Sequence, residues 1–312
     1  MNKRLLALIL LLSVLLCSSC TSGSGKGGRK SAPAASPTAA PTTVARPEAG
    51  PEHVFEPCEG GVCLTLAGSR YATEATLVVP AEHEGQPVVA LGDDCFHGFA
   101  RLESIVLPDT LRTIGKRAFE NCARLNNVVI PDSVETIGGA AFRRCYALTD
   151  VRFGKGVAVM EGDCFMHCTA LESITLPQGL TELRGNTFEG CTALREVILP
   201  EGLTAIHGYA FKDCVSLAAI ALPAGITEIR GNTFEHCSAL RAIVIPEGVE
   251  RIAARAFYNC SSLSSVTFPD SLREIGSSAF RLCPALRSVE IPRGAKVDER
   301  AFKESPTRIT YR

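Results

Sequence analysis

Cysteine and histidine are the side chains of this 312-residue chain whose chemistry could serve metal binding, catalysis or cross-linking. The sequence holds 14 cysteines and six histidines, and the densest group is Cys164, His167 and Cys168. Thiolate and imidazole are zinc ligands, and a zinc site takes three or four of them. Cys168, however, belongs to a repeated position described below and His167 to a variable one, so we predict no metal site and no cofactor.

Motifs that mark common catalytic and nucleotide-binding sites do not occur in the sequence. It contains no glycine-rich phosphate loop, no zinc-protease helix motif and no Gly-x-Ser-x-Gly elbow. The histidines have no consistent acid or nucleophile partner. The 32 Lys and Arg residues nearly balance the 33 Asp and Glu residues, so no charge excess favours an anionic polymer. The sequence therefore predicts a protein that is not an enzyme and binds neither nucleic acid nor a small-molecule substrate.

A 23-residue repeat sets the positions of most of the cysteines. Phenylalanine, leucine and cysteine each recur at this spacing over eight or nine units, and Phe302 follows one residue early. A unit of this length cannot bury its own apolar face and must stack on copies of itself. The three series are Phe96, Phe119, Phe142, Phe165, Phe188, Phe211, Phe234, Phe257 and Phe280; Leu102, Leu125, Leu148, Leu171, Leu194, Leu217, Leu240, Leu263 and Leu286; and Cys122, Cys145, Cys168, Cys191, Cys214, Cys237, Cys260 and Cys283.

Each unit contains two short apolar segments. The first, such as Val-Ile-Leu at 197–199, is rich in β-branched residues and is followed by a proline, which favours a strand that ends there. The second, such as 203–206, leads into an Ala-Phe pair. Helical hairpin repeats need about 34 residues. Units of 23 residues therefore predict a solenoid in which equivalent strands form a parallel sheet, about 4.8 Å apart.

The pattern Leu-x-x-Ile-x-Leu-Pro followed by Ile-x-x-x-Ala-Phe-x-x-Cys resembles the BspA-like, or treponemal, class of bacterial leucine-rich repeat over residues 71–302. The resemblance implies a right-handed stack of about nine to ten coils, with a parallel β-sheet on one face and short strands or 3-10 turns on the other. We expect an N-terminal cap with a hairpin and an irregular first coil at 52–95, the repeat array at 96–302, and a C-terminal cap or tail at 303–312. Phe99, Gly154 and Met160 depart from the pattern and mark locally different coils.

The N-terminus is predicted to be a lipoprotein signal peptide over residues 1–19. Lys3 and Arg4 precede an apolar run that is shorter than the roughly 20 residues of a membrane-spanning helix. The Cys-Ser-Ser-Cys sequence after this run resembles a bacterial lipoprotein box, which implies that Cys20 carries the lipid. Residues 20–51 are rich in Pro, Ala, Ser and Gly and have no apolar period, so we expect a disordered tether behind the lipidated cysteine.

Two kinds of cysteine are expected in an exported chain. The eight repeated cysteines occupy the place of small buried residues, and their parallel side-chain directions disfavour bonds between neighbours, so we expect reduced thiols. Cys58 and Cys63 differ because a Gly-Gly pair at 60–61 separates them. A two-residue turn there would pair Glu59 with Val62 and bring the cysteines together at the next pair. We therefore predict a disulfide between Cys58 and Cys63.

The outward positions of the main strands are the predicted place for a partner, because the repeated positions build the core. Apolar Ile198, Ala221 and Val244 should lie in adjacent coils about 5 Å apart and form one continuous strip. The candidate partner-binding residues are Val129, Arg152, Thr175, Ile198, Ala221, Val244 and Thr267.

These features predict a lipid-anchored binding module of the bacterial cell envelope that presents its repeat surface to a protein or glycan, as adhesins resembling this family do. Attachment to the membrane would run through the lipid on Cys20. The outer membrane or cell surface is the favoured location. The alternative is a structural or assembly component of the envelope that faces the periplasm.

Overall fold

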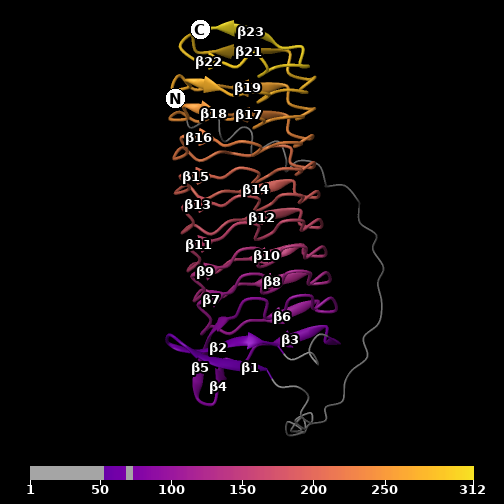
Figure 1. Cartoon of the computed structure of the whole chain (residues 1–312), viewed down its shortest axis with the longest axis vertical. Helices are drawn as coiled ribbons and strands as arrows, with labels where there is room; N and C mark the ends of the chain where they lie inside the picture. The colour runs from indigo at the N-terminus through magenta and orange to yellow at the C-terminus, as the bar shows by residue number, and fades with distance from the viewer. Residues whose placement is uncertain (1–52, 68–72) are drawn as a thin grey trace, which may run out of the picture. The chain divides into compact units, whose positions relative to one another are not determined.

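Each 23-residue unit folds as one coil of a β-solenoid, and about eleven coils stack along the long axis of the array (Figure 1). The computed structural model describes residues 53–67 and 73–312, and these contain no α-helix. The expected solenoid with parallel sheets is confirmed. The predicted signal peptide at 1–19, the lipidated Cys20 and the tether at 20–51 lie outside the described residues.

The main face of the stack carries one short strand in most coils. In each three-residue strand the middle side chain is the most buried of the three, as the alternation of side chains along a strand requires. A proline two residues after most of these strands ends them, because it has no N–H to donate. The strands are β3 (Thr76–Val78), β6 (Ser104–Val106), β8 (Asn127–Val129), β10 (Asp150–Arg152), β12 (Ser173–Thr175), β14 (Glu196–Ile198), β17 (Ala242–Val244), β19 (Ser265–Thr267), β21 (Ser288–Ile291) and β23 (Arg308–Tyr311).

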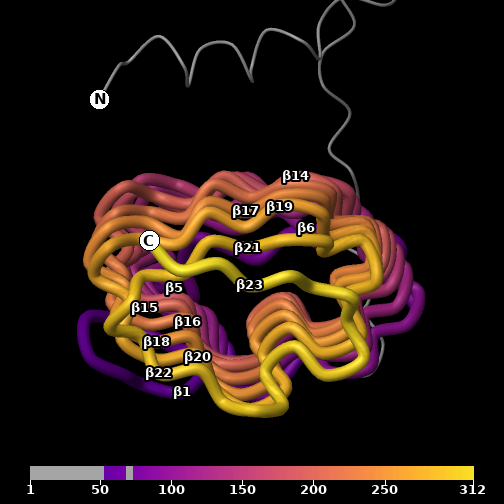
Figure 2. Tube along the Cα trace, turned by 90° about the horizontal axis from the view of Figure 1, so that it is seen from above, coloured from indigo at the N-terminus to yellow at the C-terminus, as the bar shows by residue number. Residues whose placement is uncertain are grey.

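The second face carries a parallel strand in each coil, mostly of two residues. Neighbouring coils pair at equivalent repeat positions, as Ile114 does with Ile137 and Ile252 with Ile275. Figure 2, viewed along the stack, places the main strands on one side and this second set on the other. The strands are β5 (Gln86–Leu91), β7 (Thr113–Ile114), β9 (Thr136–Ile137), β11 (Val159–Met160), β13 (Glu182–Leu183), β15 (Ala205–Ile206), β16 (Glu228–Ile229), β18 (Arg251–Ile252), β20 (Glu274–Ile275) and β22 (Lys296–Val297).

Both ends of the described stack add strands to these sheets. At the N-terminal end, β1 (Val54–Cys58) and β2 (Gly61–Leu66) form an antiparallel hairpin, and β2 continues the second face by pairing in parallel with β5. The short β4 (Glu82–His83) pairs antiparallel with β5. At the other end, residues 303–312 contain β23, which pairs in parallel with β21. The last segment therefore extends the main face as a further strand.

The turn of the N-terminal hairpin differs from the prediction. Cys58 pairs with Gly61, so the turn residues are Glu59 and Gly60. Gly60 has a φ of 85°, the left-handed value that the second central position of a type II turn requires. Gly61 serves close packing instead, because a Cβ there would lie 2.2 Å from the carbonyl oxygen of Pro87. The predicted turn is therefore wrong by one residue, and Cys58 pairs two residues away from its predicted partner, Cys63.

A ladder of stacked phenylalanine rings forms part of the core. Neighbouring rings from Phe96 to Phe302 lie nearly parallel, with centroids 5.0–5.7 Å apart. The repeated leucines and cysteines are buried beside them. Each ring sits in a turn of six residues, for example 254–259 around Phe257, which we call the Phe turn. The three residue series of the sequence thus form continuous vertical layers.

Backbone hydrogen bonds join each Phe turn to the next. In the coil of Phe165, the N–H groups of Asp163, Phe165 and His167 donate to carbonyl groups of the following coil over 2.7–3.0 Å. Asp163 and His167 have φ values of 63° and 62°, and the equivalent residues of other turns also have positive φ. The bond from the phenylalanine N–H recurs in every coil from Phe96 to Phe280.

The sheets, in contrast, are interrupted. Hydrogen-bonded pairing on the main face runs from β3 to β10, then covers β12 with β14, β17 with β19, and β21 with β23. On the second face it stops between β11 and β13 and again between β15 and β16. The gaps from β10 to β12 and from β11 to β13 fall at one coil boundary. Neither sheet continues across that boundary, whereas the Phe turn does.

Candidate binding surface

The seven candidate partner-binding residues all lie on the solvent side of the main face, as predicted. Six of them are the last residues of β8, β10, β12, β14, β17 and β19, and all seven are exposed. Nothing in the repeat requires these side chains for packing, so their identity is free to vary from coil to coil. Their role in binding stays a prediction.

The predicted strip of Ile198, Ala221 and Val244 does not lie on one hydrogen-bonded sheet. Ile198 and Val244 are 47% and 65% exposed at the ends of β14 and β17. Residues 219–221 between them form no strand, and β14 is not paired to β17 across them. The segment reads Ala-Ile-Ala, and alanine has a low strand propensity and little side chain to pack across a sheet. Sheet pairing is therefore missing at the centre of the strip, and its continuity as an apolar surface stays a prediction.

A more regular apolar surface lies nearer the N-terminal end of the main face. Val78, Val106 and Val129 are 66%, 55% and 58% exposed, and they end three adjacent strands of one hydrogen-bonded sheet. We call these three residues the valine stripe. The sequence signal was present, because Val78 stands two residues before Pro80 just as Val106 stands two before Pro108. Because the first coil is irregular, the sequence pattern alone did not identify Val78 as the equivalent of Val106.

A groove interrupts the main face directly beyond this sheet. It has a volume of about 470 Å³ and is lined by residues 150–155, which include β10, and by residues 173–178, which include β12. Two of the predicted residues, Arg152 and Thr175, line it from opposite sides. Asp150 and Arg152 form an ion pair at 2.9 Å beside it. The groove marks the position where the two strands fail to pair.

Charged side chains of the Phe turns form a network that links neighbouring coils. The Glu235 side chain is buried and accepts hydrogen bonds from Asn232 and, at 2.5 Å, from Arg255 of the next coil. His236 Nδ1 lies 2.7 Å from an Asp213 carboxylate oxygen in the preceding coil. The Arg255–Glu235 and His236–Asp213 pairs bridge neighbouring coils, and all three pairs satisfy partly or fully buried polar groups. The network therefore has a clear structural role in the array.

Cys164, His167 and Cys168 do not converge on a common point. The Cys164 thiol lies 2.9 Å from the Glu161 carbonyl oxygen, and the Cys168 thiol donates to a different backbone carbonyl. The His167 ring packs over Gly190, where a Cβ would approach Nδ1 to 2.2 Å. Within residues 53–67 and 73–312, no three His, Cys, Asp or Glu side chains are placed to hold a metal ion.

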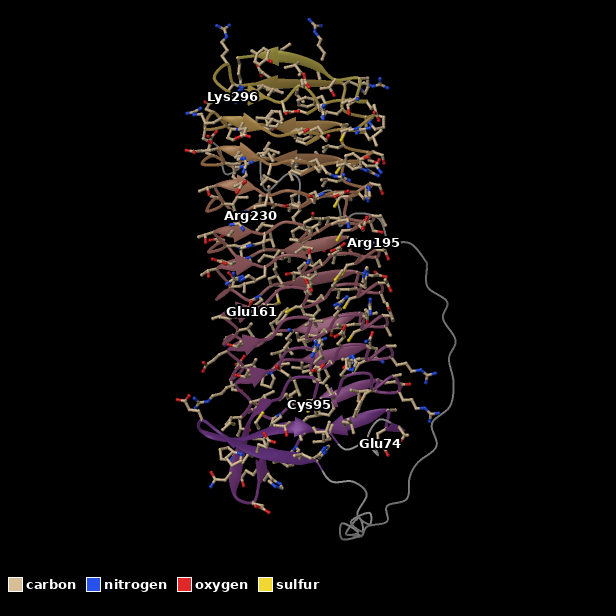
Figure 3. The ribbon with its side chains drawn as sticks, viewed as in Figure 1. Glu74, Cys95, Glu161, Arg195, Arg230 and Lys296 are labelled. Carbon is tan, nitrogen blue, oxygen red and sulfur yellow. The ribbon has the colours of Figure 1, made fainter. Side chains whose placement is uncertain are left out.

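The repeated cysteines are buried free thiols that bond to the backbone. Each donates from Sγ to the carbonyl of the phenylalanine one coil earlier, as Cys122 does to Phe96 at 3.2 Å and Cys214 to Phe188 at 3.1 Å. Burial raises the pKa of Cys122 to about 12 and that of Cys214 well above its ordinary value. Cys95, labelled in Figure 3, is also buried. These thiols stay neutral at physiological pH and act as hydrogen-bond donors.

Cys58 and Cys63 lie on one face of the hairpin but not directly opposite each other. Cys58 pairs with Gly61 and Cys63 with Glu56, so the two cysteines are diagonal neighbours. Both are free thiols in the structure. Burial and then the neighbouring Cys58 thiol raise the pKa of Cys63 to about 11. The pair is close enough to interact, and its oxidation to a disulfide stays a prediction.

The fold and the surface together define a leucine-rich-repeat solenoid whose interior is built from recurring residues and whose outer face varies from coil to coil. The family model described as the BspA type Leucine rich repeat region matches residues 89–218 and 183–308, in six copies. These matches cover more than half of the chain. The chain therefore belongs to the BspA type leucine-rich-repeat family, whose repeats form protein-interaction modules that are in general not enzymes.

Solved structures support the same fold. A leucine-rich cell surface protein from Faecalibacterium prausnitzii is 24% identical, with a TM-score of 0.53 over 85% of this chain and 94% of its own. The pneumococcal vaccine antigen PcpA is 20% identical, with a TM-score of 0.54 over 78% of this chain and 75% of its own. No curated protein matches the chain. In the part of the chain that the structure describes, no helix is long and apolar enough to cross a membrane.

Proposed function

We propose that this protein is a lipid-anchored binding module of the bacterial cell envelope that binds a protein partner through the main face of its solenoid. The valine stripe is the observation that supports this proposal most directly. Three exposed apolar side chains stand in one row on a paired sheet, and contiguous exposed apolar patches are typical of interaction surfaces. Arg152 and Asp150 in the next strand give the stripe a charged border.

The partner-binding test compares matched arginine substitutions on the two faces. Val106→Arg with Val129→Arg adds two charges that a docking surface must desolvate, so binding should be lost while the array stays folded. Val159→Arg is the control, because Val159 is an exposed valine, 40% accessible, on the second face. Binding is measured with intact cells that display each variant, against purified host matrix proteins and purified envelope proteins. Equal binding by the double variant and the wild type would remove the main face from the proposal.

The proposed membrane attachment runs through lipid on Cys20. Its support is the sequence alone: a basic start, an apolar run and a lipoprotein-like box. Several acyl chains, at about 0.8 kcal/mol per buried methylene, hold a protein stably on a bilayer. Cys20→Ala should move the protein from the membrane fraction to the soluble fraction with its array intact. Retention of that variant in the membrane would contradict lipidation at this residue.

We further propose that the array faces the outside of the cell. The charged and polar surface along the stack, including Arg195, Arg230 and Lys296 in Figure 3, suits an aqueous setting on either side of an outer membrane. External protease on intact cells distinguishes the two sides. Digestion of the array is the expected result. Protection from the protease would favour the structural role in the periplasm.

A further inference from the structure

We propose that the groove between β10 and β12 is a carbohydrate site that takes a short, hydroxyl-rich saccharide. The inference rests on the proposed binding role of the main face, because the groove opens on that face. It adds a second class of ligand at a place separate from the valine stripe. Its volume, about 470 Å³, falls within the range of small-ligand sites.

The groove lies where the sequence departs from its own repeat. Phe153 and Gly154, which line it, occupy positions that hold a leucine or isoleucine and a proline in most other coils. Met160, in β11 of the same coil, replaces an isoleucine. The departures, the loss of strand pairing and the cavity thus coincide in one coil. Phe153 and Gly154 together replace both the aliphatic residue and the proline, a combination that no other unit of the sequence shows, which indicates a local specialisation.

The two departures explain how the groove opens. The Phe153 ring stands at 87° to Phe165, with centroids 6.1 Å apart, and needs more room above its strand than a leucine does. Gly154 lets the chain press onto the coil below, because a Cβ there would lie 2.3 Å from the carbonyl oxygen of Pro131. This coil is therefore in close contact with the preceding coil at Pro131 and is not paired with the following one at β12. The groove lies on the unpaired side, between residues 150–155 and 173–178.

The gap between β19 and β21 provides a comparison, because its coil has a phenylalanine after the strand but keeps the proline. Phe268 also follows its strand and stands at 82° to Phe280, but Pro269 comes after it. Arg312 donates to the Phe268 carbonyl at 2.8 Å and pairs with Asp270, so the protein's own side chain covers this gap. Phe268 is 3% exposed, whereas Phe153 is only half-buried. The gap beside β10 therefore differs from the gap beside β19, which a side chain of the protein covers.

The lining supplies the groups that a saccharide needs. Ser173 and Thr175 present hydroxyls and Gln178 an amide, so each can both donate and accept hydrogen bonds. The Asp150 carboxylate adds an acceptor and Arg152 a set of donors. The half-buried Phe153 ring adds an apolar surface for the C–H side of a sugar. Mixed donors and acceptors beside an aromatic ring match a polyol better than an apolar side chain.

Two other ligands fit the groove less well. An acidic polymer needs an excess of cations, but Arg152 is paired with Asp150, which leaves Lys155 as the other cation in the lining. An extended peptide that adds to a sheet needs a strand edge open to solvent. The edges of β10 and β12 face each other across a single coil boundary. The geometry therefore favours a compact ligand held by side chains.

The test uses the full chain and a panel of immobilised, defined oligosaccharides, both neutral and carboxylate-bearing, read by biolayer interferometry. The site variant is Ser173→Ala with Thr175→Val, which removes two hydroxyls and keeps the β-branched shape at 175. The control is Thr113→Val with Thr136→Val, which removes two hydroxyls from paired strands of the second face. We expect at least one saccharide to bind, with roughly tenfold weaker binding in the site variant and unchanged binding in the control. Thermal unfolding midpoints of both variants should match the wild type.

Three results would overturn the proposal: no saccharide binds, the site variant binds as well as the wild type, or a polyglutamate peptide binds through Lys155 while no saccharide does. The Val106→Arg, Val129→Arg protein separates this inference from the proposed function. It should lose a protein partner and keep saccharide binding. A wild-type protein that binds a protein partner but no saccharide refutes the groove and leaves the valine stripe in place.

Discussion

The Phe turns and the main face come from the same repeat, yet they tolerate variation very differently. Backbone hydrogen bonds between Phe turns run through every coil from Phe96 to Phe280, and each repeated thiol adds a bond to the preceding coil. The main face is interrupted after β10, around residues 219–221 and after β19. The difference follows from burial. A Phe turn places its ring in the core, and the cysteine directly after the turn is also buried. A main strand buries one side chain in three and leaves the others open to change.

The largest expected effect concerns pH and the thiols of the Phe-turn side. Burial raises the pKa of Cys122 and Cys191 to about 12, whereas a thiol in the unfolded chain titrates near 8.5. Above pH 8.5 the unfolded chain loses protons that the folded chain keeps, so stability falls as pH rises towards 12. Linkage gives about 2 kcal/mol per buried thiol at pH 10. The urea midpoint, measured from pH 7 to pH 10, should therefore drop steeply.

A double variant provides the control for this thiol effect. Cys214→Ala with Cys237→Ala removes two of the repeated thiols, whose pKa values are raised by burial. Its urea midpoint should depend less steeply on pH than that of the wild type. Identical slopes would show that the alkaline loss of stability comes from other groups.

The next largest effect is on the phenylalanine ladder itself. Phe211→Ala removes a fully buried ring that stacks on Phe188 and Phe234, and it should lower the free energy of unfolding by about 3–5 kcal/mol. Val244→Ala on the main face is the comparison, because Val244 is 65% exposed and should change stability by about 0.5 kcal/mol or less. Chemical denaturation measures both. Similar losses would erase the distinction between the two regions.

A smaller effect is expected where the main face opens. Gly154→Ala forces a methyl group against Pro131 and should cost about 1–3 kcal/mol by overpacking. Gly202→Ala is the matched control, since no heavy atom lies within 4 Å of a Cβ built there. The thermal midpoint of the first variant should fall and that of the second should stay near wild type. A neutral Gly154→Ala would mean that close packing on Pro131 does not hold the groove open.

The smallest effect is expected on the valine stripe. Val106→Arg should shift the free energy of unfolding by no more than about 0.5 kcal/mol, because the side chain is 55% exposed. Ile105→Arg, one residue earlier, points a charge into the core and should prevent stable folding. Circular dichroism during urea titration separates them. A large loss of stability in Val106→Arg would show that the valine stripe also supports the sheet.

The regular part of this structure was predictable because every unit must bury the same apolar face by stacking on its neighbours. The spacing of the phenylalanines fixed the ladder, and proline marked the ends of the main strands, as at Pro108 and Pro131. Burial of the repeated cysteines followed from their place in the unit. The outward direction of the seven candidate residues followed from the two-residue period of a strand.

The irregular parts were not predictable from the pattern. Two glycines at 60–61 indicated a turn, but a close approach to Pro87 assigns Gly61 to packing and moves the turn back to Glu59. The strand expected at 219–221 is absent, because pairing depends on both neighbouring coils as well as on the segment itself. The groove depended on how Phe153 and Gly154 pack against neighbouring coils of the stack.

The sequence by itself determined the coil, its interior and the direction of each side chain, because these depend on local patterning repeated at 23 residues. Tertiary structure decided where neighbouring coils stay paired and where they separate. That outcome depends on contacts a coil apart, such as Phe153 on Phe165 or Gly154 against Pro131, whose distances no linear pattern specifies. The candidate binding surfaces belong to what tertiary structure decided. The valine stripe depends on coils that are paired, and the groove depends on coils that are not.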